Sequence, residues 1–225
     1  QGETPRLLDE WQTAPVLWDA VRFMVDQREL SGQFILTGSA VPLDNAVQHT
    51  GTGRISRLTM RTMSLFESGE SNGTVSLSEL FDGKEEIEAI SELTIEQIAF
   101  AIVRGGWPAS VTDTPQNAMR HAIDYVEAII NADISRVDNI EKNPVRVRAL
   151  LRSLSRNIST LATTKTIRDD IAMGDGDGLI SEKTIGQYIN ALNRIFVTDN
   201  IPAWNPLLRS KTAIRTSSKR QFADP

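Results

Sequence analysis

The chain has 225 residues, of which 40% are hydrophobic and 24% are charged, and its net charge is −5. This composition is ordinary for a globular protein, and the length suits one large domain or two small ones. The sequence contains no cysteine, which excludes disulfides and thiolate metal sites among these residues, and its two histidines are too few for a histidine-rich metal centre.

Charge is distributed unevenly along the chain. Residues 1–110 carry a net charge of −8, whereas residues 111–225 carry +3. This change of sign predicts two regions with different partners, without proving that either one binds nucleic acid. Neither a signal peptide nor an apolar run of membrane-spanning length is recognised, so we expect a cytoplasmic protein with no membrane partner.

Near its beginning the chain carries two apolar residues, Leu7 and Leu8, that run directly into Asp9 and Glu10. This pattern is typical of a buried parallel strand that delivers acidic side chains to the carboxyl edge of a sheet, where the ligand sites of α/β proteins lie. In P-loop ATPases the first such carboxylate helps to hold Mg²⁺. The alternative is a strand end before a helix, with Asp9 or Glu10 as the helix cap.

The next two elements favour an α/β unit. An apolar stripe predicts a helix over residues 14–28. Residues 32–39 are predicted to form a second buried strand, which ends in the small polar residues Thr37 and Ser39. A strand, a helix and a second strand in this order predict two parallel strands joined by a crossover helix.

These elements resemble a known family, the AAA+-type ATPases of bacteria and archaea. In that family an ATPase core is followed by an uncharacterised C-terminal domain with a winged-helix-like part and a nuclease-like part. The order and spacing of five matching segments extend the resemblance over most of the chain. The matching segments are Leu7–Gln12, Phe34–Ala40, Gly53–Ile55, Met63–Glu67 and Gly105–Pro108.

The resemblance implies ATP and Mg²⁺ as cofactors. It assigns Asp9, at the Walker B position, to assist the metal, and Glu10 to orient the attacking water. Ser39, with Thr37 as the second choice, would sense the γ-phosphate at the neighbouring strand end. Arg54 would act as an arginine finger, from the same subunit or from a neighbouring subunit of a homo-oligomer. The alternative role for Arg54 is a surface ion pair.

One motif of that family is missing from this sequence. The phosphate loop G-x-x-x-x-G-K-[ST] does not occur: Gly83-Lys84 is the only Gly-Lys pair, and Ser78 stands where the first glycine should be. The backbone amides and the lysine of such a loop supply most of the phosphate cradle. We therefore expect this chain, which resembles an internal segment of the family protein, to bind nucleotide weakly or not at all and to show no turnover by itself.

Residues 51–110 are predicted to form short elements that complete the ATPase-like part. Alternating polarity predicts a half-buried strand over residues 55–63. Capping boxes predict helix starts at Ser76 and at Thr94, and Gly105 ends the second of these helices. The predicted inward residues of that second helix are Ile95, Ile98 and Ile102.

Two longer helices are predicted beyond residue 110. Residues 116–134 carry a single apolar stripe, which indicates a core face rather than a cofactor site. Residues 144–158 carry a second stripe of Val147, Leu150, Leu151 and Leu154, with arginines on the other faces. Those arginines either track phosphates or form a solvated, ion-paired surface.

The segment Gly174–Ser181 is similar to the middle of an EF-hand loop. Met173 and Thr184 would stand where that loop needs oxygen ligands, so we expect a turn before a helix rather than a calcium site.

That helix is predicted over residues 183–197, after a short helix at 167–172. The pair resembles a helix-turn-helix whose second helix would contact DNA, with a wing strand at 198–204. The outward residues that suit nucleic-acid contact, and that also suit any exposed helix, are Lys183, Gln187, Asn190 and Arg194.

The predicted fold class is α/β followed by mostly α: a partial, AAA+-like P-loop NTPase core with parallel strands, then a helical winged-helix-like domain. The predicted domains are residues 1–110, the ATPase core from Walker B onward, residues 111–208, the helical domain, and residues 209–225, a basic tail that leads toward a nuclease-like domain. The predicted function is a segment of a Mg²⁺-dependent protein that binds or hydrolyses ATP. The alternative is a winged-helix module that binds DNA or a protein client and keeps a non-catalytic ATPase remnant.

Overall fold

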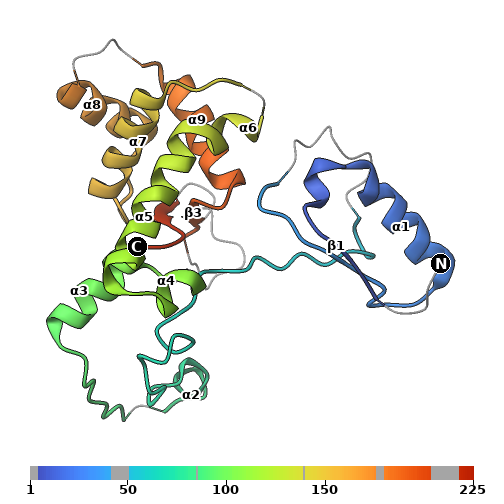
Figure 1. Ribbon diagram of the computed structural model, residues 1–225, viewed down its shortest axis with the longest axis horizontal. Helices are drawn as coiled ribbons and strands as arrows, with labels where there is room; N and C mark the ends of the chain where they lie inside the picture. The colour runs from blue at the N-terminus through green and yellow to red at the C-terminus, as the bar shows by residue number, and fades with distance from the viewer. Residues whose placement is uncertain (1–4, 42–50, 85, 139, 176–179, 204–217) are drawn as a thin grey trace. The chain divides into compact units, whose positions relative to one another are not determined.

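The computed structural model describes residues 5–41, 51–84, 86–138, 140–175, 180–203 and 218–225 (Figure 1). His49, the centre of the Gly-Asp loop at 176–179 and the basic stretch 209–217 lie outside these ranges. Contacts divide the chain into two compact units. Unit 1 contains residues 1–59 and 129–222, and unit 2 contains residues 60–128 and 223–225. This division does not follow the boundary that the sequence predicted near residue 110.

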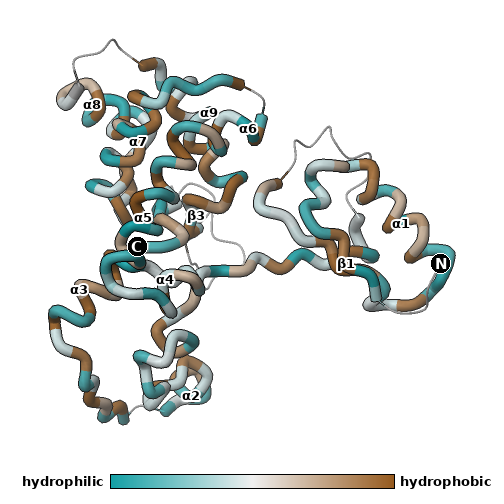
Figure 2. Tube along the Cα trace, viewed as in Figure 1, coloured by the Kyte–Doolittle hydropathy of each residue, from teal (hydrophilic) through white to brown (hydrophobic). Residues whose placement is uncertain are grey.

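Unit 1 begins with a small parallel sheet. Strand β1 (Arg6–Leu8) pairs in parallel with β2 (Phe34–Leu36), and Leu7 lies opposite Ile35. The connection is helix α1 (Val16–Arg28), which buries Trp18 and Val21. Figure 2 shows β1 as an apolar segment. The predicted order of strand, helix and parallel strand is therefore confirmed. The prediction that the two strands are buried is wrong, since Leu7 is 63% exposed and Ile35 is 56% exposed. An apolar run predicts a strand but does not show what covers it.

The remainder of unit 1 is mainly helical. Its core consists of isoleucine, leucine and valine from several helices, because the apolar stripes of those helices face one another. The two helices predicted over residues 144–158 and 183–197 both have a capped start. The side chain of Asn143 accepts from Val145 N and Arg146 N, and the side chain of Ser181 accepts from Thr184 N. The helical elements are the π-helix η3 (Ile129–Asp133), α6 (Ile134–Arg136), α7 (Pro144–Arg156), α8 (Thr164–Asp175) and α9 (Glu182–Arg194). The largest buried side chains among them are Ile130, Ile134, Val147, Leu150, Ile167, Ile185 and Leu192.

An antiparallel pair of strands completes unit 1. Strand β3 (Thr198–Ile201) pairs with β4 (Lys219–Phe222). Ser159 N donates to Arg220 O at 2.8 Å, so β4 also contacts the segment that follows α7. Residues 219–222 were predicted as part of a basic tail. They form a strand instead, because the ladder with β3 satisfies their backbone groups.

The described residues of unit 2 form short-to-medium helices, among which α5 contacts both α3 and α4 (Figure 1). The capping box at Thr94 is confirmed, since Gln97 N donates to Thr94 Oγ1 at 3.2 Å and Thr94 N donates to Gln97 Oε1 at 2.8 Å. The helices are α2 (Leu77–Phe81), α3 (Ile95–Arg104), α4 (Pro108–Thr112) and α5 (Pro115–Ala128).

Three sequence expectations fail in and beside unit 2. Helix α2 starts after Ser76 as predicted, but the Ser76 side chain accepts no hydrogen bond from a backbone N–H of the first turn, so the predicted capping box is absent. Residues 55–63 form no strand, and Leu58 is 90% exposed. The side chain of Ile95, predicted to face inward, is 81% exposed, and Ile98 and Ile102 are also exposed. Polar and apolar alternation, or an apolar helix face, shows that a segment is amphipathic but does not show what covers it.

A set of buried and half-buried residues inside unit 2 is held together by polar contacts. We call this set, Glu70, Arg104, Gly106 and Asp224, the Arg104 cluster. Arg104 donates to both carboxylate oxygens of Glu70, at 2.7 and 3.0 Å. The next residues hold two further contacts: Gly106 N donates to the carboxylate of Asp224 at 3.0 Å, and Met63 N donates to Gly106 O at 2.7 Å. Burial raises the pKa of Asp224, while the Gly106 hydrogen bond acts against that rise. Gly105 therefore ends α3, and Gly106 joins Met63 to Asp224 through its backbone.

None of the helices within the described ranges combines the length and the apolar character that a membrane span requires.

Candidate nucleotide site at the edge of the parallel sheet

The carboxyl ends of β1 and β2 bring Asp9 and Thr37 together. Thr37 N donates to Leu8 O at 3.0 Å, and Trp11 N donates to Thr37 O at 3.1 Å, so the two strand ends are tied by their backbones. The Thr37 hydroxyl donates to Asp9 Oδ1, which also accepts from Glu10 N at 3.1 Å. One oxygen of Asp9 is therefore held, and the carboxylate is fixed at the sheet edge.

Glu10 and Ser39 form a second group at the same edge. Ser39 Oγ lies 3.4 Å from Glu10 Oε2, and Gln12 Nε2 lies 2.6 Å from that oxygen and 3.3 Å from Ser39 Oγ. Asp9, Glu10 and Ser39 are exposed, whereas Gln12 is half-buried. An exposed pair of carboxylates beside hydroxyl groups leaves room for a ligand with phosphate oxygens.

A backbone turn at Glu10 places these side chains. Glu10 has φ 53° and ψ 39°, which is the left-handed region, and it precedes the short 3₁₀-helix η1 (Trp11–Thr13). Thr13 N and Thr13 Oγ1 both donate to Glu10 O, at 2.9 and 2.8 Å. Non-glycine residues in this region are uncommon and concentrate at functional sites, so the turn supports a role for Glu10.

The donor set suits Mg²⁺. Mg²⁺ prefers hard oxygen ligands and is usually bound by one or two carboxylates together with substrate phosphates and water. Asp9 supplies such a carboxylate with the Thr37 hydroxyl next to it, and Ser39 supplies a second hydroxyl next to Glu10. Within the described ranges no three or more His, Cys, Asp or Glu side chains gather in a way that could hold a metal by themselves. The edge therefore fits an ion that is shared with phosphate oxygens rather than one enclosed by protein.

Arg54 is engaged elsewhere. Its Nε donates to Asp26 Oδ1 at 2.8 Å and its Nη1 donates to Thr52 O at 3.3 Å. Asp26 belongs to α1, and both members of the ion pair are partly exposed. This is the surface ion pair that the sequence left open as the alternative to an arginine finger.

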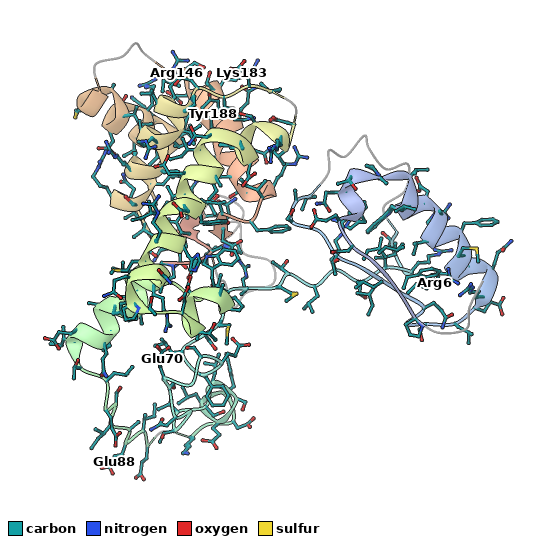
Figure 3. The ribbon with its side chains drawn as sticks, in the orientation of Figure 1. Arg6, Glu70, Glu88, Arg146, Lys183 and Tyr188 are labelled. Atoms are coloured by element: carbon teal, nitrogen blue, oxygen red, sulfur yellow. The ribbon has the colours of Figure 1, made fainter. Side chains whose placement is uncertain are left out.

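The four candidate nucleic-acid residues on α9 differ in their surroundings. Lys183, Gln187 and Asn190 are exposed. Arg194, in contrast, donates from Nε and Nη2 to Val41 O, at 3.0 and 2.6 Å. Figure 3 shows Lys183 at the same end of the helical part as Arg146, which lies near the start of α7.

The structure adds two site residues that the sequence did not single out, Gln12 and Gly38. A Cβ atom on Gly38 would lie 2.1 Å from Gln12 Oε1, so glycine is required for the amide to lie where it does. Gln12 stood in the matching Leu7–Gln12 segment, two residues after Glu10. Its position and the polarity of its side chain were the available signals.

Two family profiles match the chain. Residues 1–68 match a family described as AAA domain, and residues 95–225 match a family described as Domain of unknown function (DUF8612). The first match supports the resemblance to AAA-type ATPases over the part that contains the sheet edge. No curated protein and no solved structure matches the chain significantly.

Proposed function

Because the chain belongs to the DUF8612 family and its first 68 residues match an AAA domain, we propose that it is part of a Mg²⁺-dependent ATPase. The sheet edge at Asp9 and Glu10 is the metal-binding and water-orienting half of the proposed site. Since the sequence contains no G-x-x-x-x-G-K-[ST] motif, the chain alone is expected to bind nucleotide weakly or not at all and to show no turnover.

One observation carries this proposal: two adjacent parallel strands end in a carboxylate pair and in hydroxyl groups that hydrogen-bond to those carboxylates. Asp9 is proposed to hold the metal, and Glu10 to accept a hydrogen bond from the attacking water. Ser39, with Thr37 as the second choice, is proposed to contact the γ-phosphate. When bound, Mg²⁺ neutralises charge on the phosphate oxygens.

An arginine finger at Arg54 is a further part of the proposal. In this role the guanidinium would leave Asp26 and stabilise charge at the transferring phosphoryl group. The ion pair is partly exposed, with 47% and 38% of the two side chains accessible, so exchanging it has a small cost.

Metal binding at Asp9 is tested with Mn²⁺, which replaces Mg²⁺ and broadens NMR signals close to it. In the presence of ATP, substoichiometric Mn²⁺ is expected to broaden the amide signals of Asp9, Glu10 and Thr37 first. Asp9→Asn removes the charged ligand, so we expect about tenfold more Mn²⁺ to be needed for the same broadening.

The control for this experiment is Glu88→Gln, which removes one negative charge, as Asp9→Asn does. Glu88 lies in an acidic segment and is labelled in Figure 3. Broadening at the sheet edge should be the same in this variant as in the unmodified chain. If broadening instead follows residues 86–96 and disappears in Glu88→Gln while Asp9→Asn has no effect, the proposed metal site is wrong.

A second candidate function rests on the helical part of unit 1. We propose a winged helix for these elements, because the order α7, α8, α9, β3, β4 resembles the order expected of one and Ser159 N donates to Arg220 O in β4. This arrangement supports the proposal that α9 presents Lys183, Gln187 and Asn190 to DNA.

DNA binding by α9 is tested with Lys183→Gln. We expect weaker binding to duplex DNA and a salt dependence, log K against log salt, that is shallower by about 0.9, the value for one lost phosphate contact. The control is Lys84→Gln, because Lys84 pairs with Glu79 at 2.6 Å in unit 2 and its removal should leave the affinity unchanged. Equal effects of the two substitutions would show only nonspecific electrostatic attraction.

A further inference from the structure

We propose that Gln12 is a positioning residue that couples Ser39 to Glu10. This inference rests on the ATPase function proposed above and adds a residue to it. In this arrangement a ligand that engages the Ser39 hydroxyl changes the restraint on the Glu10 carboxylate, so the side chain that contacts the phosphate and the side chain that orients water respond together.

The amide of Gln12 contacts both partners. Its Nε2 donates to Glu10 Oε2 at 2.6 Å and to Ser39 Oγ at 3.3 Å. Ser39 Oγ in turn lies 3.4 Å from the same Glu10 oxygen. The three side chains form a closed triangle in which the bond from Gln12 to Glu10 is the shortest side.

Both contacts to Glu10 fall on one oxygen. Oε2 accepts from Gln12 and from Ser39, so Oε1 is the oxygen that remains to accept a hydrogen bond from water. A carboxylate held by one oxygen cannot rotate freely about its last bond. Gln12 therefore orients the free oxygen, which is what a residue that positions the attacking water requires.

The orientation of the Gln12 amide is set by its surroundings. If the oxygen and nitrogen were exchanged, an amide oxygen would face the Glu10 carboxylate, which is repulsive, so Nε2 belongs on that side. Oε1 then lies against Gly38, where a Cβ atom would be 2.1 Å away. Oε1 is buried, and it accepts no hydrogen bond from any residue that the structure describes.

An amide with one satisfied side and one orphaned side is well suited to move when a ligand arrives. A phosphate oxygen that accepts from the Ser39 hydroxyl takes this donor away from Glu10 Oε2. Gln12 Nε2 is then the side-chain donor that still holds this oxygen. The turn at Glu10, fixed by Thr13 N and Thr13 Oγ1, keeps the backbone in place, so the response is confined to side chains.

The coupling is tested on the full chain by NMR in the absence of nucleotide. The reporters are the side-chain amide signal of Gln12 and the carboxyl carbon signal of Glu10. Gln12→Met keeps the length of the side chain and removes the amide, and Ser39→Ala removes the hydroxyl. We expect each substitution to shift the Glu10 signal and the double substitution to shift it by less than the sum of the two shifts.

Gln33→Met is the matched control, because Gln33 contacts Arg28 at the beginning of β2, at 3.2 Å, and not the site. It should leave the Glu10 signal unchanged. Gln12→Glu is a second variant that keeps the shape and replaces the donor with an acceptor. Additive shifts, or a Gln12 signal that ignores Ser39→Ala, would overturn the coupling.

A titration with Mg²⁺ and ATP separates this inference from the proposed function. Movement of the Gln12 side-chain signal that is lost in Asp9→Asn supports both. Binding that depends on Asp9 but leaves the Gln12 signal unmoved overturns the inference and keeps the proposed function. If no nucleotide binds even at saturating concentration, which agrees with the missing phosphate loop, the Mn²⁺ experiment decides the proposed metal site and the experiment without nucleotide decides the coupling.

Discussion

Gly106→Ala is expected to lower the free energy of unfolding of unit 2 by about 3 kcal/mol. A Cβ atom at this position would lie 2.3 Å from Met63 O and 2.9 Å from Met63 N, and both are backbone atoms that cannot move aside as a side-chain end can. The clash also breaks the hydrogen bond from Met63 N to Gly106 O. Urea unfolding followed by the fluorescence of Trp107 measures the loss.

Gly186→Ala is the matched control for this substitution. Gly186 lies inside α9, and a Cβ atom there would meet no atom within 4 Å. Alanine in a helix interior is favoured over glycine by about 0.5–1 kcal/mol, so this variant is expected to be more stable. If both substitutions stabilise the protein, the result would contradict the close approach of the Met63 backbone to Gly106.

Arg104→Met is expected to destabilise unit 2 by about 3–5 kcal/mol, because it leaves the partner carboxylate of a buried ion pair without its cation. The side chain of Arg104 is 7% exposed and that of Glu70 is 26% exposed. Combining the change with Glu70→Gln should restore part of the lost stability, since the double variant has no buried charge left without a partner. Denaturant unfolding of the two single variants and the double variant completes a double-mutant cycle.

The same pair gives a pH dependence with a defined sign. The hydrogen bonds from Arg104 are the main cause that lowers the pKa of Glu70 below its ordinary value of 4.5. A carboxyl group with a lowered pKa in the folded state contributes stability above its unfolded pKa and loses it as the pH falls toward the folded pKa. The stability difference between the unmodified chain and Arg104→Met should therefore narrow as the pH falls through and below 4.5.

The ion pair of Arg120 with Asp124 on α5 serves as the control for Arg104. Its side chains are 71% and 56% exposed, so Arg120→Met is expected to change the stability by about 1 kcal/mol or less. Similar losses for Arg104→Met and Arg120→Met would contradict the buried character of the Arg104 pair.

Local rules predicted much of the fold. The apolar runs at β1 and β2, and the cap at Thr94, lie where the sequence placed them, because each depends on neighbouring residues only. Strand β4 was missed, since its pairing with β3 joins segments far apart in the sequence and its basic composition suggested a tail. The exposed face of α3 was also missed, because a stripe of isoleucines predicts amphipathicity and not its cover.

In the candidate site, too, some residues could be placed from the sequence and others could not. The sequence could place Asp9, Glu10, Thr37 and Ser39 at one edge of the sheet, because parallel strands bring their carboxyl ends together whatever the details of the turns. Gln12 was not found, because its contacts depend on the left-handed conformation of Glu10 and on a missing Cβ atom at Gly38. Neither feature follows from periodicity or from spacing.

The left-handed backbone conformation of Glu10 opposes the stability of the fold to the proposed role of this residue. A selection for stability alone would act against the carboxylate. A side chain in this region costs of order 1–3 kcal/mol, and glycine or asparagine would occupy it more cheaply. A library sorted only for resistance to heat or protease would therefore enrich those residues at position 10 and discard the carboxylate. Variants improved in that way would keep the parallel strands and Asp9 but lose the carboxylate of residue 10, so a thermostable version of this chain is the wrong starting material for testing the proposed role of Glu10.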